Sequence, residues 1–342
     1  MSFKRFDTQD IVISADSITA PAWSGDNVTL GTLYTKAQQA NGESGKYYYN
    51  AYNANPATDS TAAIQLSLAY GHVAGSGSIP LDSNVEGFSP SSIVYKQYRT
   101  LVNGTEETNL QFGGYTSDEI FVISVERARY KEKLLPGSMT LTLTSGSNTI
   151  TLTDNSNYAA TTTFSDIGRA YEIVSGSAGV RYTGTGTDGT YGYTNGFGSY
   201  GTFLPDAGLI ILSGKALNAA VVNGGLNFQS YTGVDYDKYN LNKIFGSIST
   251  GADFKLRSEE TISSNYVFVR ARNSEFNYST NPSNITGSGE LRHSVMIDSP
   301  QAYITAVGLY NDNNDLLAVA KLSRPLLKDF TKESLIRIKL DY

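Results

Sequence analysis

The sequence predicts a mainly β protein with β-sandwich-like sheets and few short helices; an α+β arrangement is the alternative. The clearest sign lies in the last quarter of the chain, where apolar and polar residues alternate in short runs bounded by turn residues. Composition agrees, because 24 tyrosines, 33 glycines and abundant Ser, Thr and Asn favour strands and turns over helices.

The last quarter carries the most strongly specified sheet of the sequence. Residues 266–272 and 335–342 each place alternate apolar side chains on one face, as strands do. Residues 303–310 and 316–322 are apolar on both faces, which predicts central strands covered on each side. Five Asn and Asp residues at 311–315 join these two runs and predict a hairpin turn.

Two substitutions test the prediction of covered strands. If both faces are buried, Ala306→Asp or Val319→Asp places an unpaired carboxylate in the core. We therefore expect either change to prevent folding.

The remaining elements follow in chain order. Apolar runs and alternation predict strands at 11–13, 64–70, 120–125 and 209–212, and a hairpin at 141–153. A helix is predicted over 91–102, since Ser89 and Pro90 suit its start and Gly104 its end. The tyrosine-rich residues 42–59 show no regular spacing of apolar residues, which predicts an irregular surface segment. Residues 176–201 are predicted to form a long Gly-rich loop, and residues 241–245 a short helix.

This distribution of strands predicts the domain organisation. Strong apolar strands occur towards both ends of the sequence, so residues 1–135 and 205–342 are expected to be two parts of one β-rich core domain. Residues 136–204 then form a hairpin plus a Gly/Tyr-rich excursion from that core.

Charge and composition exclude several classes of function. A net charge of −6 argues against a basic nucleic-acid-binding protein. The sequence has no cysteine, no visible secretion signal and no run approaching the ~20 apolar residues of a membrane helix. We expect synthesis in a cytoplasm, with no nucleic-acid partner and no membrane insertion.

Residues typical of catalysis are scarce. Histidine occurs only at His72 and His293, in unrelated contexts, and the common nucleophile, phosphate-loop and zinc motifs are absent from the sequence. Asp312 and Asp315 resemble part of a calcium loop but lack its glycine and closing glutamate, so they fit a hairpin tip better. We predict no catalytic residues, no metal site and no cofactor.

One charged pattern does stand out. In 126–133, the cations Arg127, Arg129, Lys131 and Lys133 recur at every second residue, so an extended backbone would line them along one face. Such a face is either a solvated edge strand whose charges deter pairing, or a docking ladder for an acidic partner.

Several stretches resemble a family of virion structural proteins from contractile-tailed phages of cyanobacteria. The similarity is carried by residues 1–7 and 11–18, by 126–137 (ERARYKEKLLPG), by 276–282 (FNYSTNP) and most strongly by 303–322 (YITAVGLYNDNNDLLAVAKL). The resemblance implies a tail or baseplate component that works by assembly with other virion subunits, in several copies per particle. It implies no catalysis.

Three alternative functions are consistent with these observations. The first is a structural subunit in the virion tail, which would be made in the host bacterial cytoplasm and acts through protein–protein contacts, for which tyrosine is a favoured residue. The second is a receptor- or glycan-binding β protein of the tail-fibre or adhesin type, with Tyr191, Tyr193 and Tyr200 as a sugar-stacking platform. The third is a hydrolase of cell-envelope glycans built from distant carboxylates.

Overall fold

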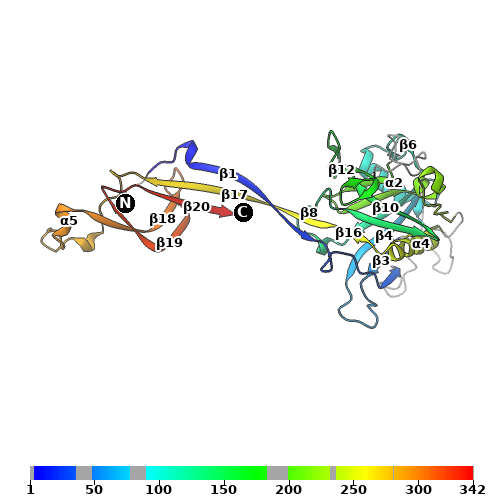
Figure 1. Ribbon diagram of the computed structural model, residues 1–342, viewed down its shortest axis with the longest axis horizontal. Helices are drawn as coiled ribbons and strands as arrows, with labels where there is room; N and C mark the ends of the chain where they lie inside the picture. The colour runs from blue at the N-terminus through cyan, green and yellow to red at the C-terminus, as the bar shows by residue number, and fades with distance from the viewer. Residues whose placement is uncertain are drawn as a thin grey trace. The chain divides into compact units, whose positions relative to one another are not determined.

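The structure is a computed structural model in which strands predominate over helices (Figure 1). This confirms the mainly β prediction. The structure describes residues 4–35, 48–77, 90–182, 199–231, 236–279 and 281–341. The chain divides into two compact units, of which unit 1 comprises residues 1–17 and 261–342 and unit 2 comprises residues 18–260.

Unit 2 is built on one large antiparallel sheet. Its main strands, in order across the sheet, are β16 (Phe254–Lys255), β9 (Thr140–Ser145), β10 (Asn148–Asp154), β12 (Gly168–Ser177), β14 (Gly201–Leu204), β15 (Leu209–Ser213), β7 (Glu119–Val125), β4 (Ile64–His72), β3 (Tyr48–Tyr52) and β2 (Thr32–Thr35). Two short strands, β11 (Thr163–Ser165) and β13 (Val180–Arg181), pair with β12. The short strands β5 (Gln111–Phe112) and β6 (Tyr115–Thr116) pair with each other, and β8 (Lys133–Leu134) pairs with β17 (Arg257–Ala271).

This topology differs from the predicted domain organisation. Residues 136–204 are not an excursion, because β9, β10, β12 and β14 lie within the large sheet between β16 and β15. Leu141, Leu143 and Leu152 of the predicted hairpin are fully buried in its core. Burial of these leucines against distant strands, which local periodicity does not reveal, makes residues 136–204 part of unit 2, whose boundaries lie at 17/18 and 260/261.

Strand β7 shows how the sheet is covered on both faces. Phe121, Ile123 and Val125 point into one core and Ile120 and Val122 into the other, as side-chain alternation requires. The predicted strand at 120–125 is therefore a central strand, buried on both sides.

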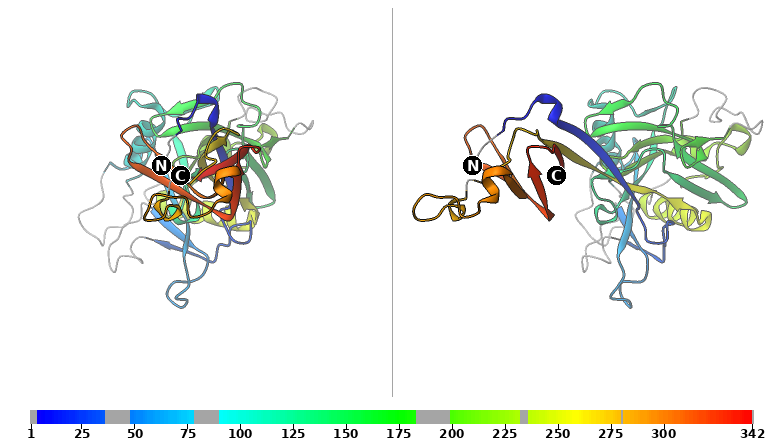
Figure 2. Two further views of the ribbon diagram at one scale, coloured as in Figure 1. Left: turned by 90° about the vertical axis from the view of Figure 1, so that its left-hand side faces the viewer. Right: turned by 60° about the vertical axis from the view of Figure 1, so that its left-hand side comes forward.

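A helix covers each face of this sheet. Helix α2 (Ser91–Asn103) confirms the predicted helix and ends at Gly104, whose left-handed φ of 67° suits glycine. Its Tyr95 is buried in the smaller core, and the phenolic oxygen accepts from the backbone N–H of Leu110 at 3.0 Å. Helix α4 (Tyr236–Gly251), seen side-on in Figure 2, is longer than the predicted helix at 241–245 and packs on the larger core. A shorter helix, α3 (Gly214–Asn218), follows β15.

The tyrosine-rich segment is only partly described, and its described part differs from the prediction. Residues 48–52 form strand β3, not an irregular surface segment. Tyr49 and Ala51 are buried and stand opposite Leu68 and Leu66 of β4. Pairing with a distant strand decides this element, although the local sequence has no clean period.

Unit 1 consists of two small sheets. One has the order β1 (Ile11–Pro21), β17 (Arg257–Ala271) and β20 (Ser334–Asp341), so both boundaries of the unit fall within strands. The other is the hairpin of β18 (Gln301–Tyr310) and β19 (Leu316–Asp329), which we call the ribbon. A short helix, α5 (Val295–Asp298), precedes it.

The core of unit 1 is small. The predicted alternation is confirmed, because Val267 of β17 and Ile336 and Ile338 of β20 are buried together with Leu309 of β18. Partly buried side chains of the ribbon, such as Val307, pack around these four. The two sheets of unit 1 thus meet face to face, as in a small sandwich.

A buried lysine closes one end of this unit. Lys328 in β19 is 0% exposed, and its Nζ donates to the carbonyl oxygens of Asp329 and Asn273 at 2.8 and 3.3 Å and to Oδ1 of Asn277 at 2.5 Å. These bonds tie the turn after β17 to the ribbon.

Candidate assembly surface

The ribbon has an inner face and an outer face. In an antiparallel pair, residues directly opposite each other share a face. The pairs Val307–Ala320 and Leu309–Ala318 pack on the core of unit 1 and define the inner face. The alternate pairs define the outer ribbon face, which contains Ala306 with Lys321, Gly308 with Val319, and Tyr310 with Leu316.

The prediction that both faces of these strands are covered is wrong for the single chain. On the ribbon, large apolar side chains stand exposed: Tyr303 at 64%, Tyr310 at 37%, Leu316 at 53%, Leu317 at 68% and Val319 at 60%. The hairpin turn at 311–315 is confirmed. Four of these residues, Tyr310, Leu316, Leu317 and Val319, lie beside the turn of the ribbon, and grouped exposed apolar side chains are typical of interaction surfaces.

Charges of opposite sign lie at the two ends of this surface. The exposed Asp312 and Asp315 lie in the turn, whereas the exposed Lys321 and Arg324 lie further along β19. Asn311 holds the turn, because its Oδ1 accepts from the backbone N–H groups of Asn313 and Asp315 at 3.0 and 2.7 Å. Between the turn and the register shift at Ala306, the outer ribbon face is therefore acidic at one end, apolar in the middle and basic at the other end, where Lys321 stands opposite Ala306.

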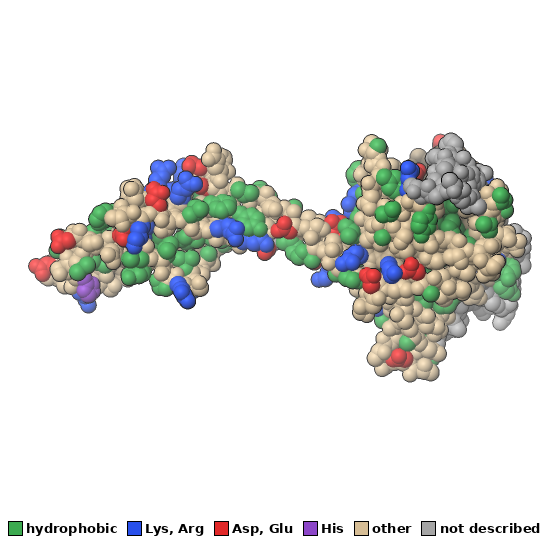
Figure 3. All heavy atoms as spheres, in the orientation of Figure 1, with side chains coloured by type: hydrophobic (Ala, Val, Ile, Leu, Met, Phe, Trp, Pro, Cys, Tyr) green, Lys and Arg blue, Asp and Glu red, His purple; other side chains and the backbone are tan. Residues whose placement is uncertain are grey.

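Unit 1 exposes apolar residues elsewhere too, and Figure 3 shows hydrophobic side chains gathered on its visible face. Within the described residues, the exposed large apolar side chains of unit 1 outnumber the four that form its buried cluster. Those outside the ribbon are Phe6, Ile11, Val12, Ile13, Tyr278, Ile285, Leu291, Val295, Ile297, Phe330 and Leu335.

The predicted basic ladder does not form. Arg127 and Arg129 lie in a 3-10 turn (Arg127–Arg129), so the two-residue period of an extended strand is broken. Arg127 donates to the carbonyl oxygen of Tyr130 at 2.6 Å and lies 4.7 Å from the centre of its ring. The Nε of Arg129 donates to the carbonyl oxygen of Ile64 at 3.2 Å.

The two lysines of that segment also separate. Lys131 is exposed, and its backbone N–H donates to Oγ of Ser258 at 2.8 Å. Lys133 begins β8, and its side chain, 18% exposed, lies 3.8 Å from the carboxylate of Glu259. Three of the four cations thus have partners within unit 2, and the four do not line one face.

The predicted sugar-stacking platform is likewise not assembled. Tyr191 and Tyr193 lie outside the described residues. Tyr200 is 2% exposed, its hydroxyl donates to the carbonyl oxygen of Gly224 at 2.7 Å, and burial raises its pKa. It is a core residue of unit 2, because the strand pairing after the Gly-rich segment carries it inward.

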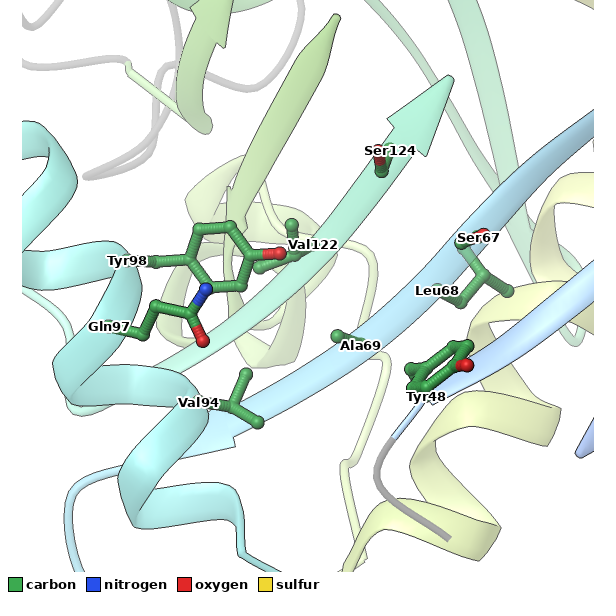
Figure 4. Close-up of a pocket in the computed structure, with 9 residues that line it drawn as sticks. All are labelled: Tyr48, Ser67, Leu68, Ala69, Val94, Gln97, Tyr98, Val122 and Ser124. Atoms are coloured by element: carbon green, nitrogen blue, oxygen red, sulfur yellow. The ribbon is translucent and has the colours of Figure 1, made fainter. Parts of the chain in front are cut away.

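The described residues of unit 2 form a concave site that the sequence did not indicate. A pocket of about 400 Å³ lies between α2 and the sheet (Figure 4). Helix α2 contributes Val94, Gln97 and Tyr98, and the strands contribute Tyr48, Ser67, Leu68, Ala69, Val122 and Ser124. Burial raises the pKa of Tyr98, which keeps its phenol neutral. The lining combines two phenol rings with hydroxyl and amide groups and carries no ionised side chain.

The described residues contain no group of three or more His, Asp or Glu side chains placed to hold a metal ion. None of the helices that the structure describes is long and apolar enough to cross a membrane.

Comparison with known proteins leaves the surface to be interpreted from its own geometry. The chain matches no family model, no curated protein and no solved structure.

Proposed function

We propose that this chain is a non-enzymatic structural subunit of a tailed-phage virion, a component of the tail baseplate that binds other tail subunits. The observation that carries the proposal is the outer ribbon face, where Leu317 and Val319 stand 68% and 60% exposed near the start of β19, beside the turn of the ribbon. An apolar surface of this kind is stable in a soluble protein when a neighbouring subunit covers it.

The position of this surface in the sequence supports the same proposal. The ribbon contains residues 303–322, the stretch that most strongly resembles the phage family. On one face of this stretch, Leu309 and partly buried side chains such as Val307 pack in the core of unit 1, whereas its other large apolar side chains are exposed. Assembly accounts for their apolar character on the outer face, which the fold of one chain does not use.

Incorporation into tails tests the proposal. Particles are assembled with the parent chain or with the double variant Leu317→Asp with Val319→Asp, and baseplates are then purified. We expect the parent to co-purify in a fixed copy number and the variant to remain free, although it should melt like the parent because both sites are exposed. A parent chain absent from purified tails and baseplates would refute the proposal.

The pocket beside α2 favours a second candidate function. We propose, as that alternative, a receptor- or glycan-binding protein of the tail, with a neutral sugar held against Tyr48 and Tyr98. Aromatic rings next to hydroxyl and amide groups suit such a ligand, since a sugar ring offers an apolar face and polar edges.

Retention on host envelope distinguishes this alternative from assembly. The parent and the variant Ala69→Trp, which fills the pocket with a large side chain, are incubated with isolated cell envelope and sedimented. A glycan receptor site predicts retention of the parent, release by free sugars and loss in the variant. Equal retention of both chains, or of neither, would eliminate the pocket as a receptor site.

A further inference from the structure

We infer that the outer ribbon face binds the same face of a second copy of this chain, turned end for end. The inference deepens the proposed function, on which it rests for its biological setting, because it names the partner of this surface. It can be tested on the purified chain without any tail, so its failure is distinguishable from failure of the proposed function.

The distribution of charge selects a second copy as the occupant. Asp312 and Asp315 mark one end of the surface, and Lys321 and Arg324 mark the other. Among the described residues, no ion pair is formed by Lys321, Arg324 or Asp312. A surface with both signs at opposite ends is complementary to itself when it is reversed.

The pairing of strands gives the geometry of the contact. Gly308 and Val319 stand opposite each other near the middle of the outer face. A two-fold axis across the ribbon at this pair reverses one copy over the other. The acidic turn of each copy then lies over the basic end of its partner, and the exposed apolar side chains meet between them, so both charged contacts form at once.

Docking by the face is favoured over addition of strands at an edge. In the described chain the ribbon has only two strands, so both of its edges are open. However, β19 contains Pro325, which lacks a backbone N–H and is typical of an edge that resists pairing. The register shifts between Ile304 and Ala306 and between Leu309 and Tyr310 also interrupt regular edges.

Sedimentation of the full chain over a range of concentrations tests the inference. We expect the parent to dimerise reversibly. The variant Leu317→Asp with Val319→Asp should remain monomeric at every concentration at which the parent is a dimer, with an unchanged melting temperature. A parent that stays monomeric, or a variant that dimerises as the parent does, would overturn the inference.

Two reversals of charge test the orientation. The basic-end variant carries Lys321→Glu with Arg324→Glu, and the acidic-end variant carries Asp312→Lys with Asp315→Lys. Each should weaken its own dimerisation at least tenfold, because like charges then face each other at both ends. In the second variant Oδ1 of Asn311 still accepts from the backbone N–H groups of residues 313 and 315, but Asp315→Lys removes the bond that Nδ2 of Asn311 donates to the Asp315 carboxylate at 2.9 Å, so the melting temperature of this variant is compared with that of the parent.

Mixing the two variants provides the decisive measurement. In the mixed dimer, each reversed end faces an opposite charge, so we expect a heterodimer as tight as the parent dimer. Matched controls reverse equal numbers of exposed charges of unit 1 outside the ribbon, as Arg5→Glu with Arg292→Glu and as Glu290→Lys with Asp298→Lys. The controls should dimerise like the parent. Reversals that weaken nothing, or a mixture that stays monomeric, would overturn the end-for-end arrangement.

Discussion

At the scale of single residues, the least expected feature is a lysine in the core of unit 1. Lys328 is fully buried, yet it faces only oxygen acceptors, from Asp329, Asn273 and Asn277. A buried ammonium is tolerated when all its protons are bonded. Here three bonds use its three protons and hold the turn after β17 against the ribbon.

Lys328→Met is therefore expected to destabilise the protein although it adds apolar volume. Methionine matches the shape but leaves the buried oxygens without a donor, which costs about 1–3 kcal/mol in the free energy of unfolding. Urea unfolding measures the change. Lys332→Met is the control, because the side chain of Lys332 is 52% exposed and solvent screens its ion pair with Asp329 on the lysine side, so its loss should cost less than that of Lys328.

The pair of Arg169 and Asp206 gives a prediction on pH. Burial by itself would raise the pKa of Asp206, but the hydrogen bonds from Arg169, the closest from Nη2 at 2.6 Å, outweigh burial and hold that pKa below its usual value. The carboxylate therefore contributes stability that is present above its unfolded pKa of about 3.9 and is lost as the pH falls through the lower folded pKa.

Asp206→Asn should accordingly lower the free energy of unfolding most at neutral pH. The difference between parent and variant should narrow as the pH falls below about 3.9, where the parent carboxylate also becomes protonated. Urea titrations across this range measure it. A difference that is the same at all pH values would show that the pair contributes no charge-dependent stability.

At the scale of elements, the ribbon separates two kinds of apolar residue that look alike in the sequence. Val267 in β17 and Val319 in β19 both lie in strongly apolar strands, yet they are 5% and 60% exposed. The expectation that Val319→Asp or Ala306→Asp prevents folding of the single chain does not hold, because both residues lie on the outer face.

We now expect Val267→Asp and Val319→Asp to behave oppositely. The first buries an unpaired carboxylate in a small core and should cost on the order of 3–5 kcal/mol, enough to unfold unit 1. The second should leave the melting temperature of the dilute chain unchanged. Thermal melting at low protein concentration checks both, and a strongly destabilised Val319→Asp would mean that the outer face is buried within one chain.

Local patterns predicted most elements where neighbours in sequence decide the conformation. The hairpin at 141–153, the helix ending at Gly104 and the alternation around Val267 all follow from turn residues and periodicity. The sequence could not distinguish a face covered within the chain from one left open, because both are apolar. The prediction of a basic ladder at 126–133 was wrong for another reason. Its spacing required an extended backbone, but Arg127–Arg129 form a 3-10 turn.

At the scale of the whole molecule, the division into units was beyond local patterns. Residues 1–17 and 261–342 are brought together by pairing of β1, β17 and β20, and only that pairing reveals unit 2 as one continuous insertion. The Gly-rich composition around 176–201 suggested an excursion, but the strands on both sides of it belong to the central sheet. The division into units is set by contacts between residues that lie far apart in the sequence, and local patterns do not reveal these contacts.

Unit 2 should therefore fold without unit 1. It has two hydrophobic cores of its own, and it needs no residue outside 18–260 to complete them. We expect a fragment of residues 18–260 to show a cooperative thermal transition with the near-ultraviolet circular dichroism of packed aromatic residues. A fragment that lacks such a transition would show that unit 2 depends on unit 1.

The order of the two units along the chain also determines which unit can fold first during translation. All of residues 18–260 emerge before β18, β19 and β20 are synthesised, so unit 2 can fold while translation continues. Unit 1 cannot close until β20 has joined β17, because Ile336 and Ile338 supply half of its buried cluster. Unit 1, which contains the exposed apolar ribbon, is thus the last part of the molecule that can complete its core.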